Sequence, residues 1–307
     1  MAIKLLDCTL RDGAYVNSSN FGNPSIKGIV KHMQDARIEI IECGWLHDLK
    51  HEEGSTFYQI PSDFEQYLIE KKKNCLYTAM IDWNKYDVEK YLPDYDGKSI
   101  DAIRVVFPHG KYAEAIKVGA GIRGKGYQVL FQLANTLAYS NEDLKTVSDK
   151  MNEFKPVAVS IVDTFGAMYE EDLLRIETAL DKYLDPAISL GFHSHNNQQL
   201  SFALSIHFVE KFVRSRRDII VDSSLCGMGR GAGNTTTELL ASYLNKMQYK
   251  NYDMNSILDA IDMYMQEFLE KYTWGYSTPN FIAGFYQCHV NNIAYLQTNH
   301  RTNALEM

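Results

Sequence analysis

Several features that mark particular classes of protein are missing from this sequence. No run approaches 18 apolar residues, so no segment is expected to span a membrane. The amino-terminal residues lack the basic, apolar and small-residue pattern of a signal peptide. The five cysteines form no CxxC pair of the kind that indicates a zinc or redox site, and four of them fall within apolar runs. We therefore expect a cytoplasmic protein with reduced, buried thiols.

Clustered positive charge is also scarce. The 307 residues include 31 Lys and Arg against 39 Asp and Glu, which gives a formal net charge of −8. The longest basic cluster is only Lys71–Lys73. Because phosphate contacts need clustered Lys and Arg, the sequence predicts no nucleic-acid partner. A hydrophobic content of 45% is normal for a globular protein, and the length allows a sizeable core.

Eight short apolar runs alternate with stretches of helical periodicity. The runs have the length and the β-branched or aromatic content of buried strands, and they are Ile3–Thr9, Ile38–Trp45, Cys75–Ile81, Ala102–Phe107, Gln128–Leu133, Val157–Asp163, Ile188–His193 and Ile219–Leu225. The helices are expected at Ser25–Ala36, Ser62–Lys72, Tyr112–Gly124, Asn141–Phe154, Glu170–Tyr183, Gln198–Val213 and Asn234–Lys246. Because parallel strands need crossover connections, this alternation favours a parallel sheet.

The number and length of these units are typical of a TIM (β/α)8 barrel. A doubly wound open sheet is the main competitor, but it should carry a glycine-rich phosphate turn after the first strand, and Arg11-Asp12-Gly13 is not one. Two more helical segments follow, at Ser256–Tyr272 and Pro279–Leu296. The sequence therefore predicts an α/β fold, with a TIM-barrel catalytic domain at residues 1–246 and a C-terminal helical extension at residues 247–307.

Polar residues end nearly every expected strand, and in a TIM barrel these ends form the active site. They are Arg11, Asp12, Glu42, Asp82, His109, Asn135, Asp163, Thr164, His193, His195 and Asp222–Ser224. His193 and His195 are two residues apart, so both point to the same face of a strand. Asp12 completes a set of two imidazoles and one carboxylate that suits Mn, Mg, Fe, Co or Zn. A pair of hydrogen-bonded histidines without a metal is the alternative.

A glycine-rich segment, Gly227-Met-Gly-Arg-Gly-Ala-Gly-Asn234, follows the eighth expected strand. Its four glycines let the backbone approach a ligand closely. The segment is expected to open a helix, where free N–H groups can receive a phosphate or a carboxylate. Asn234 would then either cap that helix or reach the metal.

Three motifs together resemble those of the DRE-TIM metallolyases. They are Asp-Cys-Thr-Leu-Arg-Asp-Gly at residues 7–13, Phe-His-Ser-His-Asn at residues 192–196 and the glycine-rich segment. This superfamily contains HMG-CoA lyase, isopropylmalate and homocitrate synthases, and 4-hydroxy-2-oxoacid aldolases. Val162–Met168 and Val221–Leu225 look most like the corresponding segments of 4-hydroxy-2-oxovalerate aldolases. The resemblance spans roughly residues 1–246.

The resemblance implies a metal site. Asp12, His193 and His195 match the metal ligands, and Asn234 matches an asparagine that ligates or neighbours the metal in some members. The expected cofactor is a divalent cation, Mn²⁺ or Mg²⁺ first, with Co²⁺ or Zn²⁺ as alternatives.

The resemblance also implies catalytic and substrate-binding roles. Arg11 matches the arginine that stabilises an enolate, Thr164 matches a hydroxyl residue that contacts the substrate carboxylate, and Glu42 matches an acidic residue that ends the second strand. Asp7 is expected to be structural.

The sequence departs from the aldolase pattern at the expected base. The aldolases have a histidine two positions after Arg-Asp-Gly, and this chain has Tyr15 there. An ordinary tyrosine is a poor base at neutral pH unless a nearby cation lowers its pKa. His47, His109 or a metal-bound water are the alternatives. The aldolases also use a C-terminal tyrosine, for which Tyr276 and Tyr286 are candidates, with Tyr276 expected to bind substrate.

These features together predict a carbon–carbon lyase, a class II pyruvate aldolase that makes or cleaves a 4-hydroxy-2-oxoacid through a metal-stabilised enolate. Its partners would be a small 2-oxoacid and an aldehyde, in a homo-oligomer, with a dimer as first expectation, and without a partner dehydrogenase. A Claisen-type acyl-CoA synthase or lyase of the same superfamily is the alternative enzyme. A catalytically silent barrel used for binding is the third possibility.

Overall fold

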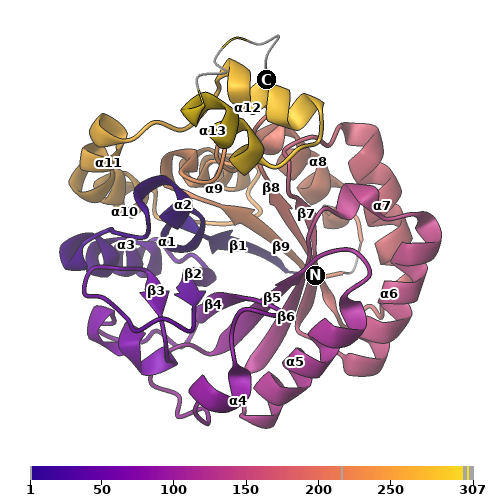
Figure 1. The fold of residues 1–307 in the computed structure, drawn as a ribbon, viewed down its shortest axis with the longest axis horizontal. Helices are drawn as coiled ribbons and strands as arrows, with labels where there is room; N and C mark the ends of the chain where they lie inside the picture. The colour runs from indigo at the N-terminus through magenta and orange to yellow at the C-terminus, as the bar shows by residue number, and fades with distance from the viewer. Residues whose placement is uncertain (1, 216, 300–302, 304–307) are drawn as a thin grey trace.

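The computed structural model describes residues 2–215, 217–299 and 303. Parallel strands form a central barrel that is surrounded by helices (Figure 1). Around the barrel the strands follow the order β1, β9, β8, β7, β6, β5, β4, β2, and pairing of β1 with β2 closes it. This confirms the predicted TIM barrel. No helix in the described part of the chain is both long and apolar enough to cross a bilayer.

The eight barrel strands match the expected runs to within a few residues. They are β1 (Ile3–Asp7), β2 (Ile40–Leu46), β4 (Leu76–Asp82), β5 (Ala102–Phe107), β6 (Gln128–Leu133), β7 (Ala158–Asp163), β8 (Ser189–Ser194) and β9 (Ile219–Ser223). A two-residue strand, β3 (Phe57–Tyr58), pairs with the end of β2. Parallel pairing throughout places the carboxyl ends of all eight strands at one mouth of the barrel.

Six long helices cover the barrel, and most match the expected segments. They are α3 (Asn23–Asp35), α5 (Tyr112–Gly124), α6 (Asn141–Phe154), α7 (Glu170–Tyr183), α8 (Ser201–Val213) and α9 (Thr237–Lys246). Short helices α1 (Thr9–Asp12), α2 (Ala14–Asn17) and α4 (Val88–Tyr91) lie in the connections. The start of α6 shows the local chemistry, since Ser140 accepts a hydrogen bond from the Asp143 amide and the Asp143 carboxylate accepts one from the Ser140 amide.

The expected helix Ser62–Lys72 is wrong in type and length. The chain forms instead a seven-residue 3₁₀ helix, η1 (Pro61–Tyr67), and turns to an extended conformation at Leu68. Ile69, which would continue the apolar stripe, is 72% exposed. Because helical stability in proteins comes largely from packing of an apolar face, nothing here stabilises further turns.

The two expected C-terminal helices are each interrupted. The first consists of α10 (Met254–Ala260), a π-helical segment η4 (Ile261–Met265) and α11 (Gln266–Lys271). The second is divided into α12 (Thr278–Phe285) and α13 (Val290–Thr298). Gln287 has a left-handed φ of 51°, and the Cys288 amide donates back to the Ala283 carbonyl, which ends α12. The division of the chain at residue 246 stays a prediction.

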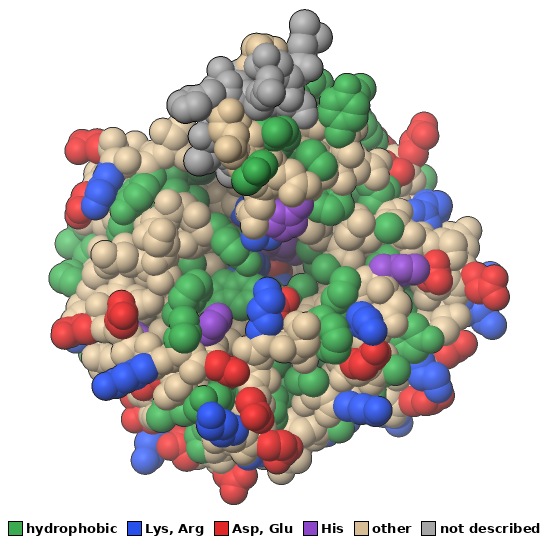
Figure 2. Space-filling model, in the orientation of Figure 1, with side chains coloured by type: hydrophobic (Ala, Val, Ile, Leu, Met, Phe, Trp, Pro, Cys, Tyr) green, Lys and Arg blue, Asp and Glu red, His purple; other side chains and the backbone are tan. Residues whose placement is uncertain are grey.

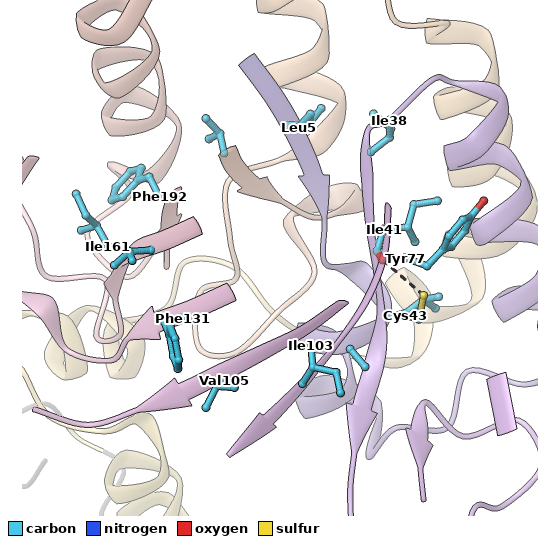
Figure 3. Packing of buried hydrophobic residues seen from close by; sticks show 14 of the residues in the cluster. Leu5, Ile38, Ile41, Cys43, Tyr77, Ile103, Val105, Phe131, Ile161 and Phe192 are labelled. Atoms are coloured by element: carbon cyan, nitrogen blue, oxygen red, sulfur yellow. Dashed lines mark hydrogen bonds between the residues drawn. The ribbon is translucent and has the colours of Figure 1, made fainter. Parts of the chain in front are cut away.

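Separate sets of buried apolar side chains fill the fold. The main hydrophobic core lies between the strands and the helices, and Figure 3 shows part of it, with Phe131, Ile161 and Phe192 on three successive strands. Inside the barrel, a small apolar layer holds Leu6, Ile40, Ala102, Leu130, Ala158 and Ile220. Two residues further along their strands, the inward positions become polar at Glu42, Arg104, Gln132, Ser160 and Asp222. This polar layer supports the mouth where the strands end.

Candidate active site

A cavity of about 420 Å³ opens at the carboxyl ends of the barrel strands. Figure 2 looks onto this face and shows a hollow near its centre, with histidine and basic side chains beside it. Six residues of the predicted site line the cavity, namely Arg11, Asp12, Tyr15, Thr164, His193 and His195. The predicted location of the site is therefore where the structure has a cavity.

Asp12, His193 and His195 form the predicted cluster. One ligand atom from each lies within 4.8 Å of the others, and all three residues are buried. The Nε2 atom of His195 is 3.5 Å from Oδ2 of Asp12. The rings of the two histidines are nearly perpendicular, with centroids 4.9 Å apart. The prediction that both histidines share one face is confirmed.

Oxygen atoms next to Nδ1 of each ring orient the two histidines. Nδ1 of His195 donates to the backbone carbonyl of Asp163 at 3.0 Å, and Nδ1 of His193 lies 3.1 Å from Oδ2 of Asp222. Because a carbonyl oxygen only accepts, His195 carries its proton on Nδ1, and its buried Nε2 has no hydrogen-bond partner. Outer hydrogen bonds of this kind are typical of histidines that bind metal through the other nitrogen.

The protonation states of the cluster also suit a cation. Burial lowers the pKa of His193, which keeps its ring neutral at neutral pH. Burial alone would raise the pKa of Asp12, but the neighbouring Arg11 guanidinium holds it well below its usual range. A neutral imidazole at His193 and an ionised carboxylate at Asp12 are forms that ligate divalent metals, so these residues fit such an ion.

Arg11 and Glu42 are joined in the same buried network. Nε of Arg11 donates to Oε2 of Glu42 at 2.6 Å, and NH1 of Arg11 pairs with Oδ1 of Asp12. The third guanidinium nitrogen, NH2, is buried without a hydrogen-bond partner among the described residues, although Arg11 lines the cavity. Glu42 therefore orients Arg11, and Arg11 keeps one donor for a ligand.

Sequence reasoning missed the other half of this network. Arg104 is fully buried inside the barrel, with NH1 2.9 Å from Oε2 of Glu42 and NH2 2.5 Å from Oδ2 of Asp222. Its NH2 also donates to Gln132. The available signal was a cation in the middle of an apolar strand, since Arg is almost never buried unless it is paired.

The glycine-rich segment approaches the cluster, but it does not open α9 directly. Asn234 lies three residues before α9, and its backbone forms a bridge with His195, so the predicted helix start and the alternative cap role are wrong. Nδ2 of Asn234 donates to the Met228 carbonyl and to Ser224, while its buried Oδ1 has no hydrogen-bond partner. The amide of Arg230 donates to Oδ2 of Asp12 at 3.2 Å. The glycine-rich segment therefore contacts Asp12 and does not form a helix N-terminus.

Tyr15 lies at the mouth, 43% exposed, with the Arg230 guanidinium 4.0 Å from the centre of its ring. Desolvation by the surrounding protein raises the pKa of the Tyr15 hydroxyl, and Arg230 offsets only part of this effect. Tyr15 is therefore a proton donor rather than a ready base at neutral pH.

The alternative histidines lie outside the main cavity. His109 is exposed and its Nε2 lies 3.2 Å from Asp143 on α6. His47 stacks on Phe57 and lines a smaller cavity beside Tyr15. The structure brings neither of them to the Asp12 cluster.

Of the remaining predicted residues, Thr164 lies in the main cavity and Tyr276 in a neighbouring one. Thr164 lines the cavity, and its hydroxyl accepts a hydrogen bond from the Asn135 amide at 2.7 Å, which leaves its proton free to donate. Tyr276 is 64% exposed and lines a neighbouring cavity, and Tyr286 is also exposed. Asp7 accepts from the Thr9 amide and from the Thr237 hydroxyl, as a structural residue does.

The C-terminal extension adds two cavity residues that the sequence did not indicate. His289 and Asn291, between α12 and the first turn of α13, line the mouth. Burial and the nearby Arg230 lower the pKa of His289. The Asn291 amide donates to Nδ1 of His289 at 3.2 Å, so the neutral ring carries its proton on Nε2. His289 is thus a neutral hydrogen-bond donor.

Sequence comparisons identify relatives over most of the chain. The profile of the HMGL-like family matches residues 110–264. A 4-hydroxy-2-oxovalerate aldolase of Geobacillus genomosp. 3 is 27% identical over 270 residues, which are 85% of this chain and 76% of that protein. An oxaloacetate decarboxylase of Mycobacterium tuberculosis is 27% identical over 262 residues, which are 83% of this chain and 74% of that protein.

Solved structures show the same architecture. The N-terminal domain of a candidate aldolase from Bacteroides vulgatus superposes with a TM-score of 0.82 at 26% identity, over 96% of both chains. The HMG-CoA lyase of Brucella melitensis shares the fold with a TM-score of 0.64 at 16% identity, over 88% of this chain and 99% of that one. The profile match and these relatives confirm the resemblance seen in the motifs, and the chain belongs to the HMGL-like family of DRE-TIM carbon–carbon lyases.

Proposed function

We propose that this lyase is a divalent-metal-dependent aldolase that makes or cleaves a 4-hydroxy-2-oxoacid, with pyruvate as the nucleophile. The observation that carries the proposal is the buried Asp12, His193 and His195 cluster beside the unpartnered NH2 of Arg11. Nitrogen and oxygen donors without a thiolate suit Mn²⁺ or Mg²⁺, with Co²⁺ or Zn²⁺ as alternatives. A cation held there would polarise the 2-oxo group and favour the enolate. Asn234, whose backbone bridges that of His195 and whose buried Oδ1 is without a hydrogen-bond partner among the described residues, would supply a further oxygen donor.

The ion-paired network around Arg11 and Arg104 supports a monoanionic 2-oxoacid as substrate. Asp12, Glu42 and Asp222 carry three negative charges, and Arg11 and Arg104 carry two positive charges, so the network has a charge of −1 when both imidazoles are neutral. A divalent cation brings the total to +1, which a carboxylate substrate neutralises. Burying a charge without such compensation is costly.

The reaction changes one carbon–carbon bond. In cleavage, the C3–C4 bond breaks, its electron pair stays with C3 as pyruvate enolate, and the C4 hydroxyl loses its proton to become the aldehyde. Arg11 donates to the enolate oxygen as charge develops there. In the addition direction Tyr15, protonated at neutral pH, donates a proton to the C4 oxygen, whereas cleavage needs the phenolate form of Tyr15 to accept that proton. Thr164 donates to the substrate carboxylate, and His289 donates to the acceptor oxygen.

Decarboxylation of oxaloacetate is a second candidate, and the raised pKa of Tyr15 favours it. Loss of CO₂ from C4 leaves the same pyruvate enolate, but it requires no base to remove a hydroxyl proton. One relative of this chain is an oxaloacetate decarboxylase. Arg11 and the metal cluster would serve both reactions in the same way.

A substrate screen tests the proposal. Purified protein is incubated with pyruvate, Mn²⁺ and a series of aldehydes, and 4-hydroxy-2-oxoacid products are detected by NMR. Oxaloacetate alone tests decarboxylation, and acetyl-CoA with a 2-oxoacid tests the Claisen alternative through thiol release. Asp12→Ala is the negative control, because it removes the central carboxylate. A protein that binds Mn²⁺ and turns over none of the aldehydes would contradict the aldolase. The dimer and the absence of a partner dehydrogenase stay predictions.

A further inference from the structure

A second cavity of about 580 Å³ adjoins the metal cavity. The two share Tyr15, Arg230 and Asn291 in their linings. Arg230 lies on the face of the Tyr15 ring at 4.0 Å, so this pair forms the boundary between the cavities. We call the second one the outer cavity. It lies between the glycine-rich segment and the C-terminal residues 273–280 and 290–291.

The side chains that line the outer cavity carry positive charge and no negative charge. Among the described residues that line it, none is Asp or Glu, and Arg230 is the single Lys or Arg. In the described part of the chain, the Arg230 guanidinium forms no ion pair; it contacts the Tyr15 ring, and its charge also acts on His289. In a protein with a net charge of −8, a half-buried cation without a carboxylate partner marks a place for an anion.

The backbone of Arg230 is held firmly. Its amide donates to Oδ2 of Asp12 at 3.2 Å. A Cβ atom on Gly229 would lie 2.5 Å from the same Oδ2, and one on Gly231 would lie 2.7 Å from Oδ1 of Asn197, so both flanking positions are tightly packed. The side chain of Arg230 can therefore move only through its own torsions, between the Tyr15 ring and an anion in the outer cavity.

The N-terminus of helix α12 adds to the positive potential of the outer cavity. Ser277, Pro279 and Asn280, in the first turn of α12 and its cap, line the outer cavity. The N-terminus of a helix carries a partial positive charge and favours anions. Arg230 and the start of α12 thus line the same space.

We propose that the outer cavity is an acceptor subsite for an aldehyde that carries a distal anionic group, a carboxylate or a phosphate, which pairs with Arg230. The reacting carbonyl would lie over the Asp12 cluster, and the chain of the acceptor would pass Tyr15 into the outer cavity. The identity of the acceptor rests on the proposed aldolase function, whereas anion binding by Arg230 does not.

The kinetic test compares acceptors with the same number of carbon atoms but with different charge. Butanal is paired with succinic semialdehyde, and glyceraldehyde is paired with glyceraldehyde 3-phosphate. We expect kcat/KM to favour the anionic member by about 10- to 100-fold, as charge-assisted hydrogen bonds do. Arg230→Met should abolish this ratio, and Arg230→Lys should keep part of it. The pair with the larger ratio identifies carboxylate or phosphate as the group recognised.

The matched control is Lys85→Met. Lys85 lines the metal cavity but is already paired with Asp82 at 2.7 Å, so its loss should leave the ratio intact. Equal kcat/KM for neutral and anionic acceptors in the unmutated enzyme would overturn the subsite. Loss of the ratio in Lys85→Met, with its retention in Arg230→Met, would overturn the role of Arg230.

A second measurement works without turnover or metal. Succinate and inorganic phosphate are titrated into metal-free protein by calorimetry, and the indole fluorescence of Trp274, which lines the outer cavity, is followed in parallel. We expect binding that Arg230→Met weakens by about tenfold or more. If no acceptor is turned over, the aldolase proposal fails while this titration still decides the subsite. Equal binding by the unmutated protein and Arg230→Met overturns it.

Discussion

Arg104 and Asp222 form an ion pair across the interior of the barrel, with NH2 of Arg104 2.5 Å from Oδ2 of Asp222 and both side chains at most 1% exposed. The same Oδ2 lies 3.1 Å from Nδ1 of His193. Arg104 also contacts Glu42, which holds Arg11. The side chains that face the ligand are therefore positioned by partners on other strands of the barrel.

Asp222→Asn should weaken metal binding while the barrel stays folded. The asparagine amide lacks the negative charge that orients His193 and pairs with Arg104. Mutation of a residue that contacts a metal ligand typically lowers metal affinity by about 10- to 100-fold. Calorimetric titration with Mn²⁺ measures the effect. Ser223→Ala is the control, because the neighbouring Ser223 hydroxyl contacts Thr237 instead. Equal Mn²⁺ affinity in Asp222→Asn and the unmutated protein would remove Asp222 from the site.

Gly229→Ala should also damage the metal site. The added Cβ would lie 2.5 Å from Oδ2 of Asp12 and 2.3 Å from Nδ2 of Asn234, so one of these side chains has to move. We expect loss of Mn²⁺ affinity at unchanged circular dichroism. Gly124→Ala is the matched control, because no atom lies within 4 Å of its Cβ position at the end of α5. That variant should bind Mn²⁺ normally and be up to about 1 kcal/mol more stable.

The rate of aldol cleavage should rise with pH. Cleavage needs the ionised form of Tyr15, and desolvation raises the pKa of this hydroxyl, with Asp12 and Asp82 adding to the rise and Arg230 and Arg11 opposing it. Below that pKa, each pH unit should increase kcat by about tenfold as the phenolate population grows. Tyr15→Phe should be slow and independent of pH. A cleavage profile that is flat between about pH 6 and about pH 9 would exclude Tyr15 as the proton acceptor.

We expect the ionisation of Asp7 to lower the free energy of unfolding as pH rises. Burial raises the pKa of Asp7 from 3.8 to about 6, so the folded state favours the protonated form. The free energy of unfolding is then highest below pH 3.8 for this group and falls as pH rises through about 6.

The variant Asp7→Asn lacks this titration. We expect its stability relative to the unmutated protein to improve by about 2–3 kcal/mol between pH 4 and pH 7, measured by urea denaturation. Asp35→Asn, at an exposed position on α3, should show no such trend. Parallel pH profiles for the unmutated protein and Asp7→Asn would contradict the shifted pKa.

The local sequence pattern was sufficient to predict most of the secondary-structure elements and part of the site. The β-branched and apolar runs identified all eight barrel strands, because a buried parallel strand requires apolar side chains on both faces. The two-residue spacing of His193 and His195 predicted that both rings lie on one face, because side-chain direction alternates along a strand. Patterning failed at residues 62–72 and in the C-terminal helices, where packing and one left-handed residue end the helical turns.

The sequence by itself determined the alternation of strands and helices and the chemistry of the ligand set, because both depend on residues close together in the chain. Only the tertiary structure decided that Arg104 meets Asp222, 118 positions later, and that His289 reaches the barrel mouth. It also decided that Arg230 borders two cavities. Such contacts follow from closure of the barrel and from the path of the C-terminal segment, which no local periodicity encodes.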